Sequence, residues 1–145
     1  MARYSIAGRS TVVGTTLRAM ASLFSTAAVT ARIVEVGVFN TTSTAVAVSL
    51  VRFTNATGVG AGLTESKHRP ESPAATCTGF AGHTADGAVG DTLAYASLGA
   101  AVGSGVIWTF GDSGVFTLIG TANGVGLICP VGTGQICDYT VTWDE

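Results

Sequence analysis

The stretch that decides the fold is residues 31–58, ARIVEVGVFNTTSTAVAVSLVRFTNATG. Two β-rich runs, 33–39 and 45–53, alternate in polarity, and the polar residues 40–44 lie between them. Alternation with a period of two is typical of half-buried strands, so the stretch predicts a β-hairpin with a short loop. We expect each strand to turn one row of side chains inward: Val34, Val36 and Val38 in the first, and Val46, Val48 and Leu50 in the second.

The rest of the chain reads as further short strands between Gly-rich turns. Residues 17–29, LRAMASLFSTAAV, fit either an amphipathic helix or a strand, and the flanking Thr and Ser residues favour the strand. The C-terminal third predicts more strands and a closing hairpin around PVGTG: residues 93–98, 105–110, 115–119, 124–129 and 135–145. In the last strand one apolar row is expected: Cys137, Tyr139, Val141 and Trp143. The pattern predicts an all-β fold, an antiparallel β-sandwich or barrel-like single domain with long Gly/Pro-rich loops.

Two segments stand apart from the expected strands. Residues 1–10, MARYSIAGRS, lack a core pattern, so we expect an N-terminal arm that orders on a partner, followed by one β-rich domain over 11–145. Residues 58–75 are the most polar part of the chain and predict a surface loop that contacts a partner. The candidate contact residues in this loop are Glu65, Lys67, His68 and Arg69.

The composition points away from a freely dissolved, charged domain. Charged residues make up 11% of the 145 residues and hydrophobic ones 47%, whereas soluble domains carry roughly 25% charged residues. Such a surface suits a protein docked on a larger assembly. The arginines are scattered and there is one lysine, so we expect no nucleic-acid partner. The chain shows neither a signal-peptide pattern nor a long apolar window, so we expect no membrane partner and an intracellular product.

The run GDSGV, 111–115, raises the question of a nucleophilic Ser113. A Ser–His–Asp triad needs a histidine base, and the two histidines, His68 and His83, lie in polar loops where the side chain is usually solvated. Gly-Asp-Ser-Gly between apolar runs is favourable turn chemistry. We therefore expect Ser113 to lie in a turn, with no catalytic residue, no cofactor, no metal site and no enzyme activity.

The three cysteines, Cys77, Cys129 and Cys137, are scattered and lack the spacing of metal ligands. The absence of a secretion signal favours reduced, buried thiols. In CPVGTGQIC, however, Cys129 and Cys137 lie symmetrically about Thr133, and a hairpin there would place them opposite each other. A disulfide between these two therefore stays open as an alternative.

Five stretches together resemble small virion proteins of tailed bacteriophages that infect actinobacteria: ARIVEVGVFNTTSTAVAVSLVRFT, GAGLTE, GVIWTFGDSGV, TANGVGLICPVGTGQ and DYTVTWDE. The chain looks like a capsid decoration (cement) or minor head protein, and the resemblance spans residues 2–145. It implies a β-sandwich-like domain that is made in the host cytoplasm and binds the outer capsid surface of the virion. The implied partners are the major capsid protein and the chain itself, most often as a homotrimer.

The expected work of such a protein is mechanical. Binding only the assembled lattice stabilises that lattice by mass action, without catalysis and with little charge. The resemblance supplies no binding residue position by position. The expected capsid contacts are therefore residues of the N-terminal arm: Ala2, Arg3, Tyr4 and Arg9.

Two rival functions stay open. A receptor- or glycan-binding tip on a head or tail fibre would use exposed aromatic residues such as Trp108 or Tyr95, together with the loop 58–75. Otherwise Trp108 and Trp143 predict packing in the core or at a subunit interface. A hydrolase would need a histidine within hydrogen-bond reach of Ser113. An exposed cleft lined by aromatic residues would favour the glycan reader, and a broad apolar base would favour decoration.

Overall fold

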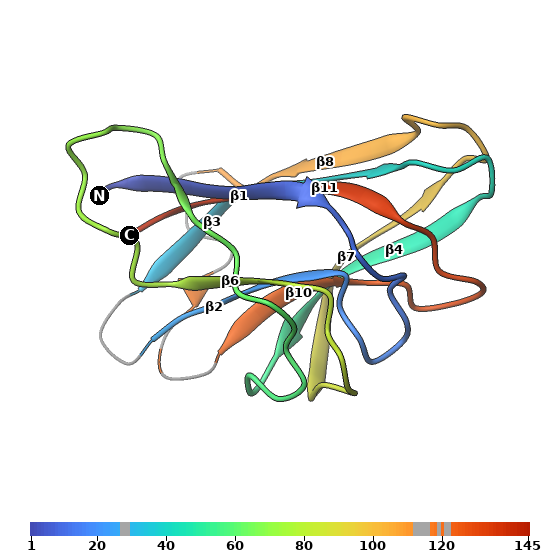
Figure 1. Cartoon of the computed structure of the whole chain (residues 1–145), viewed down its shortest axis with the longest axis horizontal. Helices are drawn as coiled ribbons and strands as arrows, with labels where there is room; N and C mark the ends of the chain where they lie inside the picture. Colours follow the sequence, from blue (N-terminus) through green and yellow to red (C-terminus); the bar gives the residue numbers. More distant parts are fainter. Residues whose placement is uncertain (27–29, 112–116, 119, 121–122) are drawn as a thin grey trace.

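In the computed structural model the chain forms two antiparallel β-sheets packed face to face (Figure 1). The structure describes residues 1–26, 30–111, 117–118, 120 and 123–145. Their strands are β1 (Arg3–Arg9), β2 (Ala21–Phe24), β3 (Ala31–Asn40), β4 (Val46–Phe53), β5 (Ser66–Lys67), β6 (Thr78–Ala81), β7 (Val89–Leu98), β8 (Gly105–Thr109), β9 (Thr117–Leu118), β10 (Gly124–Ile128) and β11 (Cys137–Asp144). The expected all-β sandwich is confirmed. Over the described residues, no helix is long and apolar enough to cross a membrane.

The strand order identifies the topology. The first sheet runs β5-β1-β11-β3-β8, with β9 also paired to β3, and the second runs β6-β2-β10-β4-β7. Without the short strands β5, β6 and β9, four strands in the order β1-β11-β3-β8 face four in the order β2-β10-β4-β7, which is a jelly roll. In this arrangement the connections β1–β2, β3–β4, β7–β8 and β10–β11 meet at one end of the sandwich, and both termini lie at the other (Figure 1).

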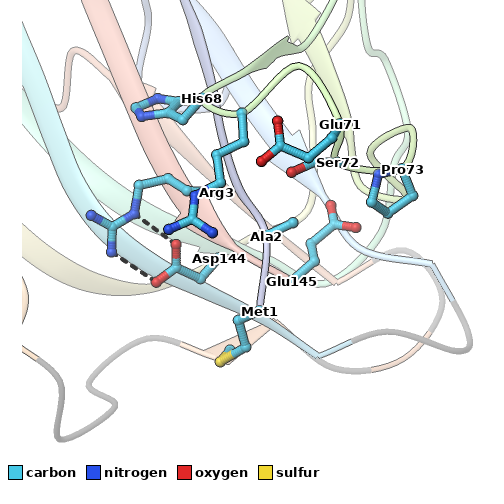
Figure 2. Close-up of a pocket in the computed structure, with 10 residues that line it drawn as sticks. Met1, Ala2, Arg3, His68, Glu71, Ser72, Pro73, Asp144 and Glu145 are labelled. Atoms are coloured by element: carbon cyan, nitrogen blue, oxygen red, sulfur yellow. Dashed lines mark hydrogen bonds and ion pairs between the residues drawn. The ribbon is translucent and has the colours of Figure 1, made fainter.

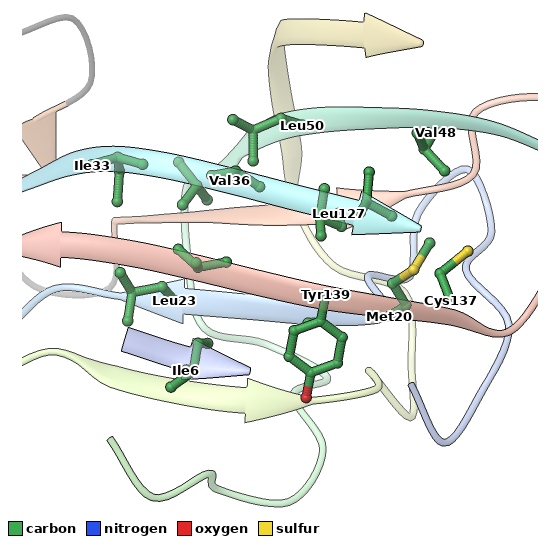
Figure 3. Close-up of a cluster of buried hydrophobic side chains, with 14 of the residues drawn as sticks. Ile6, Met20, Leu23, Ile33, Val36, Val48, Leu50, Leu127, Cys137 and Tyr139 are labelled. Atoms are coloured by element: carbon green, nitrogen blue, oxygen red, sulfur yellow. The ribbon is translucent and has the colours of Figure 1, made fainter. Parts of the chain in front are cut away.

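A hydrophobic core fills the space between the sheets, and side chains from both sheets point into it (Figure 3). The second predicted row is buried as expected, and so is the apolar row of β11. In the first row Val36 and Val38 are buried, but Val34 is not. A register irregularity in the β3–β11 pairing, between Thr142 and Trp143, brings Ile33 into the core in place of Val34. The ambiguous segment 17–29 contains a strand, the fully buried β2.

Both predicted hairpins are wrong, although the strands in them are correct. Strands β3 and β4 belong to different sheets, and so do β10 and β11. A period-two pattern marks the inward face of a strand, and two strands can share that pattern in one sheet or across a core. The connection 41–45 therefore carries the chain from the first sheet to the second rather than reversing it within one sheet.

The first ten residues do not form the expected separate arm. Residues 3–9 are strand β1, which pairs with β11 along its whole length, from Arg3 opposite Asp144 to Arg9 opposite Asp138. Tyr4 and Ile6 on its inner face are each 1% exposed. Two inward side chains are too few to show as a sequence pattern, and the partner strand lies at the other end of the chain.

The outer face of the second sheet is covered as well. A second apolar cluster lies there, formed by Ala19, Phe24, Val51, Phe53 and Ile128. Ala56 and Val59 of the β4–β5 connection pack against it, and so do Phe80 of β6 and Val89 of β7. Strands β2 and β10 are therefore buried on both faces, which explains why neither alternates between buried and exposed residues.

Candidate functional site

Four turn segments at one end of the sandwich contain no charged side chain. The four connections that meet there contain residues 10–17, 40–45, 99–104 and 129–137 (Figure 1). None of these segments contains Asp, Glu, Lys, Arg or His. Together they are termed the uncharged platform below.

A buried asparagine joins two of the connections. Asn40 is 1% exposed, and its Nδ2 donates hydrogen bonds to the carbonyl oxygens of Thr44 at 2.6 Å and Gly99 at 3.1 Å. Its Oδ1 accepts hydrogen bonds from the backbone N–H and the Oγ1 of Thr42, each at 3.0 Å. The backbone N–H of Asn40 also donates to the carbonyl of Ser104 at 2.7 Å. One side chain thus holds the β3–β4 and β7–β8 connections in a fixed arrangement.

The other two connections belong to the same network. The Oγ1 of Thr41 donates to the carbonyl of Ile136 at 2.6 Å, which ties β3–β4 to β10–β11. The backbone N–H of Cys137 donates to the Oγ of Ser10 at 3.0 Å, which ties β10–β11 to β1–β2. A Cβ added at Gly134 would collide with the backbone of the β1–β2 connection, so these two segments lie in direct contact. The platform is therefore one hydrogen-bonded unit rather than four independent loops.

Valine side chains project from this platform into solvent. Val102 is 73% exposed, Val131 is 57% exposed and Val13 is 44% exposed. A shallow hollow of about 240 Å³ adjoins Val131, and it is lined by Ala45, Val46, Ala47, Ser97, Leu98, Val131, Gly132 and Thr133. Exposed branched apolar side chains on a rigid, uncharged base are typical of a surface that packs against another protein.

The charged residues that border the platform are paired. Arg9 contacts Asp138 at 2.7 Å, and Arg18 contacts Asp86 at 2.7 Å. The hydrogen bond from Arg9 holds the pKa of the Asp138 carboxyl below its ordinary value. Both pairs are exposed and contribute little to stability. Their effect is that the rim of the platform presents balanced charge and does not favour a partner of either sign.

The opposite end, where the termini lie, is charged. An open hollow of about 690 Å³ is lined there by Met1, Ala2, Arg3, His68, Arg69, Glu71, Ser72, Pro73, Asp144 and Glu145 (Figure 2). The guanidinium of Arg3 donates to both carboxylate oxygens of Asp144, at 2.7 and 2.9 Å. This contact holds the pKa of Asp144 below its ordinary value. The hollow mixes cations and anions and is not selective for ligands of one sign.

The structure brings parts of the two expected contact sets together at this hollow. Ala2 and Arg3 come from the N-terminal segment, and His68 and Arg69 come from the polar loop. Arg9 does not join them, because it lies at the other end of β1, beside the platform.

Three of the expected contact residues make hydrogen bonds within the chain. Tyr4 is 1% exposed, and its hydroxyl donates to the carbonyl of Pro73 at 3.1 Å, so its side chain is not available to a partner. Glu65 accepts a hydrogen bond from the backbone of β6 at 3.1 Å. The Nζ of Lys67 donates to the carbonyl of Ser72 at 2.8 Å. The hydrogen bonds of Tyr4 and Glu65 fasten the long loop to the sandwich, whereas that of Lys67 joins two residues within the loop.

A serine and a histidine do meet, but in the interior. The Oγ of Ser22 lies 2.9 Å from the Nε2 of His83, and the two residues are 1% and 2% exposed. The imidazole lies against Phe53, with ring centroids 5.0 Å apart, and burial lowers the pKa of His83. The expectation of a solvated His83 is therefore wrong, whereas His68 is exposed as expected. No substrate can reach the buried pair, and Ser113 lies outside the described residues.

The thiols and carboxylates offer no further chemistry in the part of the chain that the structure describes. Cys77, Cys129 and Cys137 are free and buried. Burial raises the pKa values of Cys77 and Cys137 to about 12, which keeps both thiols protonated. Among the described residues, no group of three or more His, Cys, Asp and Glu side chains could hold a metal ion.

Comparison of the chain with protein-family models, curated proteins and solved structures gives no match. The candidate site is therefore defined by its own geometry, and the platform is the feature that sequence reasoning missed. The signal that could have found it is the absence of charge from four separate turn segments, which becomes meaningful once the topology brings them together.

Proposed function

We propose that this chain is a structural virion protein that binds the outer surface of a phage capsid lattice and stabilises it. The observation that carries the proposal is the uncharged platform, a rigid surface with exposed valines at one end of a jelly roll. The resemblance of the sequence to capsid decoration proteins supplies the identity of the lattice. Jelly rolls occur in capsid proteins and in lectins alike, so the fold alone does not decide between them.

The platform has the physical properties of a lasting protein interface. Interface cores are depleted of charged residues, because each buried charge needs a partner to offset its desolvation. Burying Val102 and Val131 would remove two largely exposed apolar side chains from water. Because Asn40 already holds the loops in place, binding would cost little conformational entropy.

The glycan-reading alternative has less support in the described residues. A sugar-binding site normally stacks an aromatic ring on the sugar, and neither hollow described above is lined by Phe, Tyr or Trp. Trp143 is 0% exposed, and Trp108 packs against the main core. Tyr95 is 53% exposed, but it lies on a strand outside both hollows.

The test is to add the purified protein to shells of the major capsid protein assembled without it, and to image the particles by electron microscopy. We expect density at repeating lattice positions, with the platform facing the shell. Absence of such density would contradict the proposal, and density with the platform facing solvent would contradict the assigned surface.

A charge placed on the platform gives the matched comparison. The double variant Val102→Glu and Val131→Glu should bind shells at least about tenfold more weakly, since two carboxylates would lose hydration in the contact. Ala7→Glu places a charge on the exposed outer face of the first sheet, away from the platform, and should bind like the unmodified chain. Equal binding by all three proteins would overturn the assignment of the platform.

A further inference from the structure

We propose that the side of the sandwich formed by β7 and β8 docks against the same side of a second copy of this chain. The two β7 strands would pair antiparallel across a two-fold axis and join the second sheets of both copies. This side, termed the open flank, comprises Val89–Leu98, Gly105–Thr109 and Phe110. The inference is independent of the proposed function, because it concerns a different surface and is tested without a capsid.

The edge strands on the two sides of the sandwich differ in length and in how the chain covers them. On one side the edges are β6 with four residues, β5 with two, and the part of β1 beyond Ser5, with which β5 does not pair. The β4–β5 connection covers β6. The N–H of Leu63 donates to the carbonyl of Gly79 at 2.9 Å, and the N–H of Ala81 donates to the carbonyl of Ala61 at 2.8 Å. On the other side β7 has ten residues, and among the described strands it pairs with β4 alone. A long uncovered edge presents backbone donors and acceptors to any strand that approaches.

Part of β7 is protected and part is not. Its pairing with β4 shifts register twice opposite Leu50–Phe53, which makes the first half of β7 irregular. Such bulges discourage the addition of another strand. From Ala94 to Leu98 the pairing with β4 is regular, so this half of the strand can accept one.

The core is also incompletely covered on this flank. Six apolar side chains that pack against the main core remain partly exposed there: Leu93, Ala94, Ala96, Val106, Trp108 and Phe110. Tyr95 and Ile107 beside them are 53% and 54% exposed. An apolar margin along two edge strands resembles a core that continues into a neighbouring subunit.

The charge pattern selects a second copy as the occupant. Residues 92–111, TLAYASLGAAVGSGVIWTFG, contain no charged side chain, so they offer no feature by which an acidic or basic partner would be recognised. Two identical neutral edges meet without like-charge repulsion. Asp91 lies at the start of β7, and antiparallel pairing places the Asp91 residues of the two copies at opposite ends of the contact.

A two-fold axis between two copies would use the open flank of both, so no third copy could add to it. A two-fold axis near Ala96 would put Tyr95 of each copy opposite Ser97 of the other, and it would bring the two β8 strands together in the facing layer. An isologous contact of this kind is satisfied by two copies. The expected oligomer is thus a dimer rather than the trimer that the resemblance implies.

The first measurement is the molar mass of the full chain by light scattering across a dilution series. We expect a species of twice the 14.5 kDa chain mass that dissociates on dilution. Iodide quenching of tryptophan fluorescence should rise with dissociation, because Trp108 is partly exposed on the flank whereas Trp143 is fully buried. A monomer at every concentration, or a trimer, would overturn the proposal.

A pair of lysines tests the surface itself. The double variant Tyr95→Lys and Ser97→Lys changes two exposed side chains of the edge and should be monomeric with unchanged circular dichroism. The matched variant Ser5→Lys and Ala7→Lys places two lysines at the same spacing on β1, on the opposite side of the first sheet from β8, and should remain dimeric. A lysine variant of β7 that remains dimeric, or amides of Ala94–Leu98 whose hydrogen exchange does not slow in the dimer, would refute pairing through this edge.

Discussion

Replacement of Asn40 by alanine should loosen the platform and lower the stability of the whole domain. The side chain makes two hydrogen bonds to loop carbonyls through Nδ2 and accepts two more through Oδ1. Each such bond contributes about 1 kcal/mol net. Since Thr44 and Gly99 are exposed and their carbonyls can recover water, we expect a total loss of about 3 kcal/mol rather than the full sum.

The assay is thermal unfolding followed by circular dichroism, with urea unfolding as a second measure. For a domain of this size a loss of about 3 kcal/mol corresponds to a fall in Tm of about 10 °C. Asn55→Ala is the matched control, because Asn55 is exposed and its Oδ1 accepts hydrogen bonds from the backbone N–H and the Oγ1 of the nearby Thr57. That control should shift Tm by no more than about 3 °C.

A second substitution at the same position isolates the hydrogen-bond donors. Asn40→Asp keeps the size of the side chain but turns a carboxylate oxygen towards the carbonyls of Thr44 and Gly99. In this environment the folded protein favours the protonated acid, so the folded-state pKa lies above the unfolded value of about 3.9. The variant should therefore recover stability as pH falls towards the unfolded pKa, and lose it as pH rises through the folded pKa. Equal Tm shifts for Asn40→Ala and Asn55→Ala, or an Asn40→Asp variant insensitive to pH, would refute the role of Asn40.

Three further predictions concern the interior. Burial lowers the pKa of His83 in the folded protein, so as pH falls the unfolded chain protonates this imidazole at a higher pH than the folded protein does. The free energy of unfolding should therefore keep its full His83 contribution above about pH 6.5 and decline as pH falls below that value. Urea midpoints measured from neutral to mildly acidic pH check this, and His83→Phe should remove the His83 part of the slope while His68→Gln should keep it. Ile6→Ala should cost about 3 kcal/mol, measured by urea unfolding, because Ile6 is 1% exposed in the core. Deletion of residues 2–10 should unfold the domain; a cooperative thermal transition in that truncated protein would show that β1 is dispensable.

Much of the local structure follows from short-range pattern. Alternation in residues 33–39 and 45–53 correctly marked two strands, and the row Val46, Val48 and Leu50 was correctly placed inward. The pattern could not say that β3 and β4 belong to different sheets, since an inward face looks the same in either arrangement. It also could not reveal the bulge that exchanges Val34 for Ile33, because the irregularity lies in the pairing with β11.

The candidate surfaces show the same division. Segments that are short and polar, such as the start of the chain and the surroundings of His83, looked exposed because nothing local indicated burial. Elements distant in sequence bury parts of both: Tyr4 and Ile6 of β1 lie in the core beside β11, and His83 lies against Phe53. Likewise Ala2, Arg3, His68 and Arg69 share one hollow because the termini and the polar loop meet at one end.

By itself, then, the sequence determined that the chain is all-β, where most strands lie, which side chains face inward and how little charge the surface carries. These properties depend on residue type and spacing over a few positions, where sterics and burial act locally. Tertiary structure alone decided the jelly-roll order, the gathering of four neutral turns into a platform and the exposure of β7 as a free edge. Those depend on contacts between residues as far apart as Arg3 and Asp144, which form because antiparallel pairing and core burial join whole segments, and no local pattern specifies which segments those are.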